Sequence, residues 1–560
     1  MHWTRRTFIK TIGVAGAGTL AGGSTLVTSC QNPSGFDILI TGGIVIDGTG
    51  AVAFSGDIGI IGDQIVEIGN LAANGGKRVI DATGLIVSPG FIDIHSHTDL
   101  SLLVDPEANS KIRQGVTTEV AGQDGGSYAP MTDERLLGLQ QGYGERYGVD
   151  INWKDFPAYF DAMDQNKIGI NFTSFVGQGT IRGMVVGSRN MRATTRQIDE
   201  MKAVVEESFA GGAWGISSGL EYTPGSFAPK EEIAELCKVA QSYGGIYATH
   251  IRNEDDKVVE AVEEAIWIAR EAGIPLQIAH FKSIGKRNLD KVSRCFEIIE
   301  NANWEGMDIT LDRYPYIAYA TTLQNLFPTS YRDGGAEAFV KRLQNPRILG
   351  QMQRAALGKV NMLGDWSHVM ISSVSEKNRS YIGKRVTEIV EETEENPFDF
   401  VRNLLIEEKG EVGMIGFGMS EEEIRSVLTH PLVMISSDGG AAATSGPLSR
   451  LKPHPRWYGT FPRVLGQYCR EKQYFQLPEA VHKMTGMPAK RLGLKDRGKI
   501  DVGHAADIVL FDPETVNDQA DFFNPHQYAT GIEYVLVNGS VAIEKGEHTG
   551  ALTGKVLRKG

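Results

Sequence analysis

Two histidines separated by one residue, His95 and His97, close an apolar run in the string VSPGFIDIHSHTDL. On a β-strand, residues i and i+2 point to the same side, so both imidazole rings would meet at one point where the run ends. Imidazole is the commonest protein ligand for zinc and related divalent ions. Asp93 and Asp99 flank the pair and could orient the rings or supply local charge. A lone pair of this kind also fits two polar loop residues, so a metal site needs further ligands from elsewhere in the chain.

Three more metal-binding side chains close apolar runs. His250 ends the run YATH, His280 ends QIAH, and Asp438 ends MISSD. The chain has only 12 histidines, so chance hardly explains why histidines stand at three of these four run ends. If the runs are parallel strands of one barrel, their carboxyl ends face the same mouth and the side chains converge. The pattern therefore predicts a metal site built from several strand ends.

The elements that must position these residues follow a repeated pattern of strand and helix. Most of the apolar runs are separated by segments with helical spacing, such as KEEIAELCKVAQSYG and DKVVEAVEEAIWIAREAG. Eight such units favour the α/β class and a (β/α)8 TIM-like barrel, in which function gathers at the carboxyl ends of the strands. The eight runs are GFIDIH, GVTTEVAG, IGINFTSFVG, AWGISSG, GIYATH, PLQIAH, MDITLD and LVMISSD.

The two ends of the chain have a different sequence pattern from the barrel segments. Residues 36–88 consist of short apolar segments broken by glycine, and the same texture returns within residues 491–560. Because chain ends often lie together, we expect one small β-sandwich built from both segments. The barrel then occupies residues 89–490. Within it, residues 321–413 are too many for one helix between the seventh and eighth strands, and we expect an inserted lid there.

The first 30 residues carry a targeting message. Arg5 and Arg6 precede a weakly apolar run rich in glycine and alanine, which resembles a twin-arginine export signal. A permanent transmembrane helix needs about 20 strongly apolar residues, which this run does not supply. Its end, LVTSC, resembles a lipoprotein cleavage box with the lipid on Cys30. We expect residues 1–30 to direct export to the periplasmic side of a bacterial membrane, with a lipid anchor at Cys30. A soluble periplasmic protein is the alternative.

Composition and charge exclude several classes of function. The chain has 560 residues, of which 41% are hydrophobic and 22% charged, as is ordinary for a globular protein. Its formal net charge of −13 and the lack of a basic cluster in its body argue against nucleic acid as a partner. The three cysteines after Cys30 are scattered, so no disulfide framework is indicated. The sequence does not indicate an oligomeric state.

Several strings of the chain are similar to those of the amidohydrolase superfamily, and within it to those of the N-acyl-D-amino-acid deacylases, or D-aminoacylases. The similarity runs from about Phe36 to the C-terminus. The resemblance implies hydrolysis of the amide bond of a small substrate, an N-acyl-D-amino acid, with one or two Zn²⁺ ions as cofactor. The preference for D substrates follows from the resemblance alone. The most specific strings are GFIDIHSHTD, QGVTTEVAG, SSGLEYTPG, THIRNE, AHFKSIG, DRYPY, ISSDG and HPRWYGTFPRVLGQY.

The resemblance also implies two metal positions. The histidines of the first strand would hold one, those of the fifth and sixth strands would hold the other, and Asp438 would be both a ligand and the general acid/base. Related sequences usually have cysteine or glutamate after the second strand as the remaining or bridging ligand, whereas this chain offers Asp124 in AGQDGGSYAP. Aspartate is harder than thiolate and shorter than glutamate. The expected ligands are His95, His97, Asp124, His250, His280 and Asp438.

The implied reaction also assigns roles to residues that contact the substrate. A divalent ion lowers the pKa of its bound water from 15.7 to about 7, and Asp438 would take the proton and pass it to the leaving amine. The substrate's α-carboxylate needs a fixed cation, and Arg456 in HPRWYG offers a bidentate fork. Lys282 in HFKS and Tyr222 in GLEYTPG match residues that the family uses for the same purpose.

Two other functions fit parts of the pattern. A cyclic-amide hydrolase of the dihydroorotase or hydantoinase type, or a dipeptidase for D-containing peptides, could use the same fold. Many of those enzymes carry a carboxylated lysine after the fourth strand, and AWGISSGLEY has no lysine. A non-catalytic exported lipoprotein is the other alternative. The complete set of candidate ligands argues against a non-catalytic protein. Only the unusual Asp124 supports that alternative.

Overall fold

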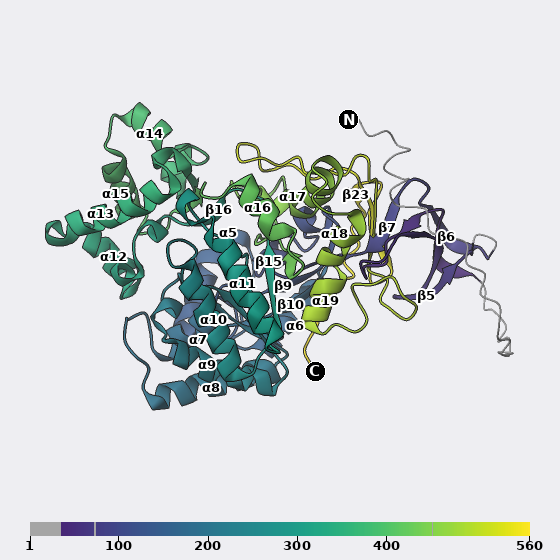
Figure 1. Ribbon diagram of the computed structural model, residues 1–560, viewed down its shortest axis with the longest axis horizontal. Coiled ribbons are helices and arrows are strands. Elements are labelled where there is room, and N and C mark those ends of the chain that lie inside the picture. The colour runs from purple at the N-terminus through teal and green to yellow at the C-terminus, as the bar shows by residue number, and fades with distance from the viewer. Residues whose placement is uncertain (1–34, 72–73, 451) are drawn as a thin grey trace.

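The computed structural model describes residues 35–71, 74–450 and 452–560. The expected export signal, residues 1–30 with Cys30, lies outside the described residues. Figure 1 shows a barrel in the centre, a cluster of helices, α12 to α15, at the left, and β-sheets formed by both ends of the described chain at the right. Within the described ranges, none of the helices is long and apolar enough to cross a membrane.

The barrel has the eight parallel strands that the sequence predicts. The first three strands pair in order, and β11 (Val176–Gly177) extends the third strand and pairs with the fourth. The fourth to the eighth also pair in order, and a parallel bridge between Ser96 and Gly439 closes the ring. The strands are β8 (Phe91–Asp93), β9 (Val116–Ala121), β10 (Asn171–Ser174), β12 (Gly215–Gly219), β13 (Ile246–His250), β14 (Leu276–Ile278), β15 (Ile309–Arg313) and β19 (Val433–Ile435).

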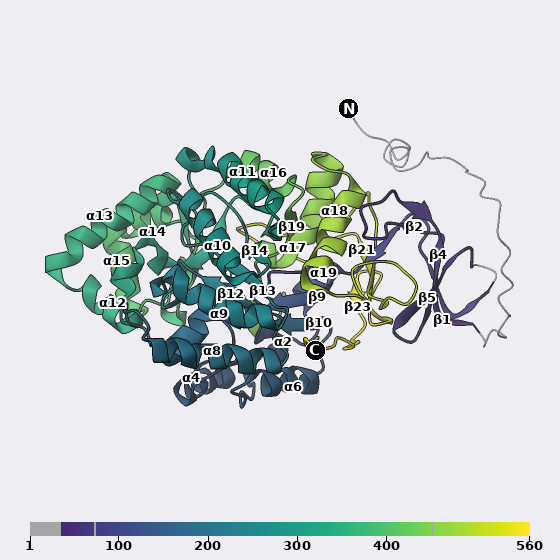
Figure 2. The same ribbon diagram turned by 60° about the horizontal axis from the view of Figure 1, so that its bottom comes forward.

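The helices that cover the barrel begin and end where local chemistry favours it. In α8 a capping box pairs Thr194 and Gln197 at the N-terminus, and α10 ends at Gly273 in the left-handed conformation. Their apolar faces pack on the strands, and Figure 2 shows four of them side by side. These four are α8 (Thr195–Ala210), α9 (Lys230–Ser242), α10 (Val258–Ala272) and α11 (Lys291–Trp304).

Shorter helices complete the barrel. Three of them, α17, α18 and α19, follow the last strand, and the others follow the first three strands. They are α2 (Ser101–Val104), α3 (Asn109–Ile112), α4 (Asp133–Leu139), α5 (Glu145–Tyr147), α6 (Phe156–Asn166), α7 (Gln178–Val185), α17 (Arg456–Arg463), α18 (Leu477–Met484) and α19 (Gly486–Leu492).

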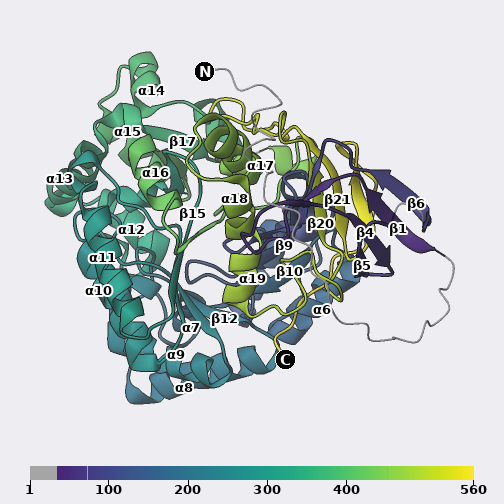
Figure 3. The ribbon, with the colours of Figure 1, turned by 45° about the vertical axis from the view of Figure 1, so that its right-hand side comes forward.

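A β-sandwich is built from both ends of the chain, as expected (Figure 3). One sheet has the order β5-β4-β1-β6 and the other β23-β22-β21-β20-β7-β2-β3. Ile40 and Ile60 of the first sheet share a buried cluster with Leu510 and Leu536 of the second. The strands are β1 (Phe36–Thr41), β2 (Ile44–Val45), β3 (Phe54–Ser55), β4 (Asp57–Ile61), β5 (Gln64–Gly69), β6 (Gly76–Asp81), β7 (Ile86–Pro89), β20 (Ile508–Phe511), β21 (Ile532–Val537), β22 (Ser540–Glu544) and β23 (Glu547–His548).

The last residues of the chain leave the sandwich and return to the barrel. The Leu557 amide donates to the Phe172 carbonyl at 2.7 Å, and the Trp214 indole donates to the Leu557 carbonyl at 2.7 Å. The C-terminus accordingly lies beside the barrel helices in Figures 1 and 2. Residues 491–560 were expected to belong wholly to the sandwich. Their last segment instead pairs with the third barrel strand.

An insertion separates β15 from β19, as expected for a lid. Its strands form an antiparallel sheet in the order β16-β18-β17, and its helices enclose a separate apolar core that includes Phe339 and Val401. After it, α16 (Glu421–Leu428) leads back to the barrel. The elements of the insertion are β16 (Tyr319–Thr322), α12 (Gly335–Leu343), α13 (Pro346–Leu363), β17 (Val369–Ser373), α14 (Val386–Thr393), α15 (Pro397–Glu407) and β18 (Gly413–Gly416).

Candidate metal centre and active site

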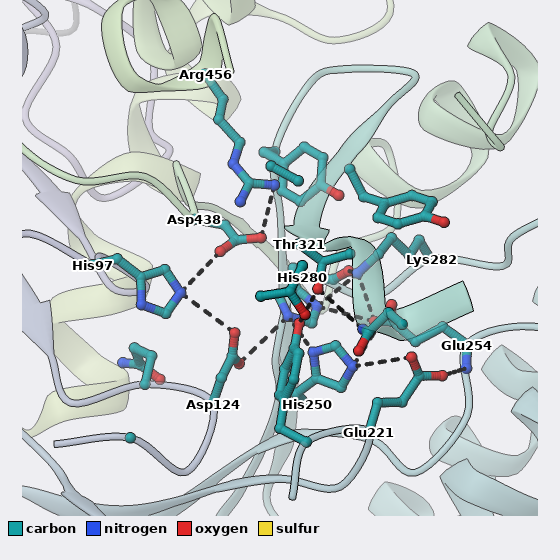
Figure 4. Close-up of a pocket in the computed structure, with 18 of the residues that line it drawn as sticks. His97, Asp124, Glu221, His250, Glu254, His280, Lys282, Thr321, Asp438 and Arg456 are labelled. Carbon is teal, nitrogen blue, oxygen red and sulfur yellow. Dashed lines mark hydrogen bonds and ion pairs between the residues drawn. The ribbon is translucent and has the colours of Figure 1, made fainter. Parts of the chain in front are cut away.

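The side chains expected as metal ligands lie together at the carboxyl ends of the barrel strands (Figure 4). They form two groups, in each of which the ligand atoms lie within 4.8 Å of one another. Asp124 belongs to both groups. The first group is His95, His97, Asp124 and Asp438, and the second is Asp124, His250 and His280.

The ligand atoms of the first group face one another at 3.1 to 3.6 Å. His97 Nε2 lies 3.1 Å from Asp438 Oδ1 and 3.4 Å from Asp124 Oδ2. His95 Nε2 lies 3.6 Å from an oxygen of each of the two carboxylates. His95 Nε2 and Asp124 Oδ1 are buried without a hydrogen-bond partner, although buried polar atoms normally have one. Nitrogen and oxygen atoms that face one space in this way fit a divalent cation such as zinc.

The second group is joined to the first through Asp124. Asp124 Oδ1 lies 3.4 Å from His280 Nε2, and His280 Nε2 lies 3.0 Å from His250 Nδ1. Thus Oδ1 faces His95 and His280, whereas Oδ2 faces His97. The two oxygens of one aspartate can therefore serve both metal positions, although the side chain is shorter than glutamate.

Three of the expected ligands have a backbone conformation that is uncommon outside glycine. The φ angle is 53° for Asp124, 33° for His280 and 48° for Asp438. Positive φ costs roughly 1–2 kcal/mol for an ordinary residue and persists only where the surroundings hold it. The Asp438 amide, for example, donates to the His95 carbonyl at 2.9 Å. The backbone thus fixes where these side chains begin before any ion is bound.

Two carboxylates that were not among the expected site residues orient the histidines from behind. Asp312 Oδ1 lies 3.4 Å from His95 Nδ1, and Glu254 Oε1 lies 3.1 Å from His280 Nδ1. Burial would raise the pKa of the Asp312 carboxyl, but His95, Ser436 and His280 together outweigh burial and the pKa is lowered. Sequence signals existed for both, since Glu254 follows His250 by four residues in THIRNE and Asp312 ends the seventh apolar run.

Asp93 does not have the orienting role that the sequence suggested. It accepts from Lys111 Nζ at 2.8 Å and from the Ser437 amide at 2.9 Å. Lys111 is fully buried and also reaches Glu119 at 2.8 Å and the Gly439 carbonyl at 2.8 Å. This network joins the first and second strands to the segment that carries Asp438, so its effect on the ligands is indirect.

Asp99 and the residues expected to bind substrate line a cavity of about 420 Å³ beside the metal centre. Burial raises the pKa of the Asp99 carboxyl to about 6. Arg456, the first residue of α17, places Nη1 2.9 Å from Asp438 Oδ2. Lys282 Nζ lies 2.5 Å from Glu254 Oε1 and 2.9 Å from His280 Nδ1. Tyr222 directs its hydroxyl toward the insertion, 3.3 Å from Thr321 Oγ1.

The two cations therefore already have carboxylate partners, which was not apparent from the sequence. Burial would raise the pKa of the Asp438 carboxyl, but Arg456 and the neighbouring histidines outweigh burial and hold it below its usual range. The ring of Tyr314 lies between the cations, 4.6 Å from the Arg456 guanidinium and 5.8 Å from Lys282 Nζ. The cavity wall thus holds two cations next to the ligand groups, and each of them is already paired with a carboxylate.

Comparison with known proteins identifies the family to which the chain belongs. The model of the amidohydrolase family matches residues 78–345 and 398–543, and the chain belongs to this family. Residues 346–397, which the match omits, lie in the insertion.

The chain is also similar over most of its length to relatives with named activities. The chain is 35% identical to D-aminoacylase of Alcaligenes xylosoxydans xylosoxydans, over 94% of this chain and 98% of the relative. It is 33% identical to N-acyl-D-aspartate deacylase of the same organism, over 94% and 96%. The crystal structure of N-acyl-D-glutamate deacylase from Bordetella bronchiseptica, complexed with zinc and a phosphonate inhibitor, matches with a TM-score of 0.78 and 31% identity, over 94% of this chain and 100% of that one.

Proposed function

We propose that this protein hydrolyses the amide bond of N-acyl-D-amino acids, releasing a carboxylate and a free D-amino acid, with one or two zinc ions as cofactor. The observation that carries the proposal is the combination of two ligand groups joined at Asp124 with a cavity whose wall holds Arg456 and Lys282. Relatives named as D-amino-acid deacylases, one of them bound to zinc, support the substrate class and the metal.

Asp438 is the proposed general acid/base. It stands within 3.1 Å of His97 and is held ionised by Arg456, so it can accept a proton from the attacking water. When bound, zinc acts as a Lewis acid and makes water reactive near neutral pH. Asp438 then returns the proton to the leaving nitrogen, and transfer of this kind contributes about 10²- to 10⁴-fold to the rate. His250 and His280 would hold the metal together with Asp124.

Arg456 is the proposed anchor for the α-carboxylate of the substrate, with Lys282 and Tyr222 as further contacts. A guanidinium can bind a carboxylate through two parallel hydrogen bonds, which an ammonium cannot do. Arg456→Lys should therefore raise KM by about 10- to 100-fold, as expected for a charge-assisted hydrogen bond of roughly 1.5–3 kcal/mol. An unchanged KM in steady-state kinetics would show that Arg456 does not anchor the α-carboxylate of the substrate.

The test of the proposed function is hydrolysis of a panel of N-acetyl-D- and N-acetyl-L-amino acids together with D-containing dipeptides. The protein is used zinc-replete and without residues 1–30, with Asp438→Asn as the control. We expect turnover of D substrates that is lost in the control. Cleavage of the dipeptides alone would replace the proposal with a dipeptidase, and no cleavage despite bound zinc would show that the substrate class is wrong.

We further propose that the protein is exported and is anchored to the periplasmic face of the membrane by a lipid on Cys30. The motif around Arg5 and Arg6 and the string LVTSC support this proposal. In a bacterial host fed radiolabelled palmitate, we expect label in the wild type and none in Cys30→Ser. Arg5→Lys/Arg6→Lys should keep the protein in the cytoplasm. An unlabelled periplasmic wild type would favour the soluble alternative, and a wild type left in the cytoplasm would exclude export.

A further inference from the structure

A second cavity, of about 700 Å³, lies beside the cavity of the metal centre. Its walls come from the loop after β9, from α4 and α7, and from the loop after β12. The side chains of Leu139, Met184 and Pro224 line it, and many of its other lining residues are glycines. We call this cavity the glycine groove. Its volume is within the range of small-molecule sites, roughly 300–1,000 Å³.

The glycine groove adjoins the cavity of the metal centre, and the two share four lining residues. Asp124, Gly126, Arg135 and Tyr222 line both cavities. Asp124, the candidate ligand that both metal positions share, is thus also part of the wall of the groove.

The positions of the charged residues show which part of a substrate would extend there. In Figure 4, Arg456 lies above Asp438 and Lys282 lies to the right of His280, whereas Asp124 lies below Asp438, on the side away from Arg456. A substrate with its α-carboxylate at the cations and its scissile carbonyl at the ligand groups therefore directs its acyl chain past Asp124. On that side Asp124 borders the glycine groove.

Two helical glycines keep the groove open without a packing reason. Gly138 lies in α4 and Gly183 in α7, and both line the groove. A Cβ atom on Gly138 would meet nothing within 4 Å, and one on Gly183 would meet only the Pro224 ring at 3.7 Å. Glycine inside a helix is destabilising relative to alanine. By contrast Gly125, with φ of 75°, is required by its turn. The space above the two helical glycines is thus free for a ligand.

We infer that the glycine groove binds the acyl group of the substrate and favours linear acyl chains much longer than acetyl. The inference rests on the proposed function. An acetyl group ends close to the metal centre, whereas an octanoyl chain reaches Leu139 and Met184. Burial of a methylene group in apolar surroundings improves binding by about fourfold. The mostly apolar lining gives a charged acyl group no matching partner beyond the entrance at Arg135.

The experiment compares N-acetyl-D-methionine with N-octanoyl-D-methionine on the zinc-loaded enzyme. In the wild type we expect kcat/KM to be at least about 10-fold higher for the octanoyl substrate, because several methylene groups are buried at about fourfold each. Gly183→Leu fills the groove and also favours the helix. It should lower kcat/KM for the octanoyl substrate by about 10-fold or more and change the acetyl substrate by less than about twofold.

Gly350→Leu is the matched control, because Gly350 lies in α13 and a Cβ there would meet only the end of Arg354 at 3.8 Å. Both rates should stay unchanged in this variant, and zinc content should be equal in all three proteins. Equal rates for the two substrates in the wild type, or an equal loss for both in Gly183→Leu, would overturn the inference.

A separate binding measurement distinguishes failure of the groove from failure of the proposed function. If neither substrate is hydrolysed, the proposed function fails, and calorimetry with octanoate and acetate then tests the groove. Octanoate binding that is tighter than acetate binding and is weakened in Gly183→Leu would support a site for acyl chains. Equal binding of the two acids, or no binding, would overturn it.

Discussion

Asp124 stands between the two ligand groups, and each of its oxygens faces a different histidine. Removal of this one side chain takes a ligand from both metal positions, whereas removal of His250 takes a ligand from one. We therefore predict that Asp124→Ala lowers the zinc content per chain more than His250→Ala does, as measured by elemental analysis after dialysis. Circular dichroism checks that both variants are folded. An Asp124→Ala protein that keeps its full zinc content would contradict a shared ligand.

Lys111 compensates two buried carboxylates, Asp93 and Glu119, directly beneath the metal centre. Removal of one partner of a buried ion pair costs about 3–5 kcal/mol, because the other charge stays buried without compensation. We predict that Lys111→Met lowers the free energy of unfolding by this amount in urea titrations. It should also lower kcat, because Lys111 holds Ser437 and Gly439 on either side of Asp438.

The double variant Lys111→Met/Glu119→Gln separates charge from packing in this prediction. It removes one of the two uncompensated carboxylates, so it should recover part of the lost free energy of unfolding. A double variant less stable than Lys111→Met would show that the lysine acts through its packing instead of its charge.

At the scale of elements, strand ends were the part of the site that the sequence could predict. His250, His280 and Asp438 each close an apolar run. A parallel barrel brings such positions together for any conformation of the connecting loops. Glu254 and Asp312 were harder, because their roles depend on which imidazole nitrogen faces the metal. Asp93 was misjudged because its partner, Lys111, comes from α3, a helix of only four residues without a strong signal.

The insertion is attached to the barrel mouth by an ion pair that no local pattern predicts. Lys359 Nζ, from α13, lies 2.5 Å from Asp255 Oδ2, which follows β13. Both side chains are mostly buried, and Lys359 lines the cavity of the metal centre. The position of the insertion over the substrate therefore depends in part on this pair.

We predict that Lys359→Met increases amide hydrogen exchange in α13, because Asp255 loses its cation and the helix is held less firmly. Lys341→Met in α12 is the control, since its pair with Glu337 is exposed and 3.6 Å long and such surface pairs contribute little. Hydrogen exchange measured by mass spectrometry should change in the first variant only. Equal exchange in both variants would mean that apolar packing alone holds the insertion.

At the scale of the whole molecule, the sequence predicted the fold class and the joining of the chain ends in one sandwich. The composition of residues 36–88 and 491–560 carries that signal, because short apolar runs with glycine turns form sheets. It could not show that the final residues return to the barrel. Backbone hydrogen bonds between distant segments leave no pattern in side chains, and the string TGKVLRKG has none.

The returning C-terminal segment is predicted to stabilise the barrel as a third-strand partner. Phe172 pairs through both its amide and its carbonyl with Lys555 and Leu557, and Asn538 donates to the Thr553 carbonyl at 2.6 Å. Deletion of residues 553–560 leaves the buried backbone groups of Phe172 unpaired, which costs about 1–3 kcal/mol for each group. The zinc-loaded truncated protein should therefore unfold at a lower temperature by a few degrees, at about 1 °C for each kcal/mol in a chain of 560 residues. Arg558→Ala is the control. It removes the half-exposed ion pairs to Asp161 and Asp164 and a contact with the Phe160 ring, and it should change Tm by much less, because exposed pairs contribute about 0–1 kcal/mol. A truncated protein with the Tm of the wild type would show that the barrel does not need this segment.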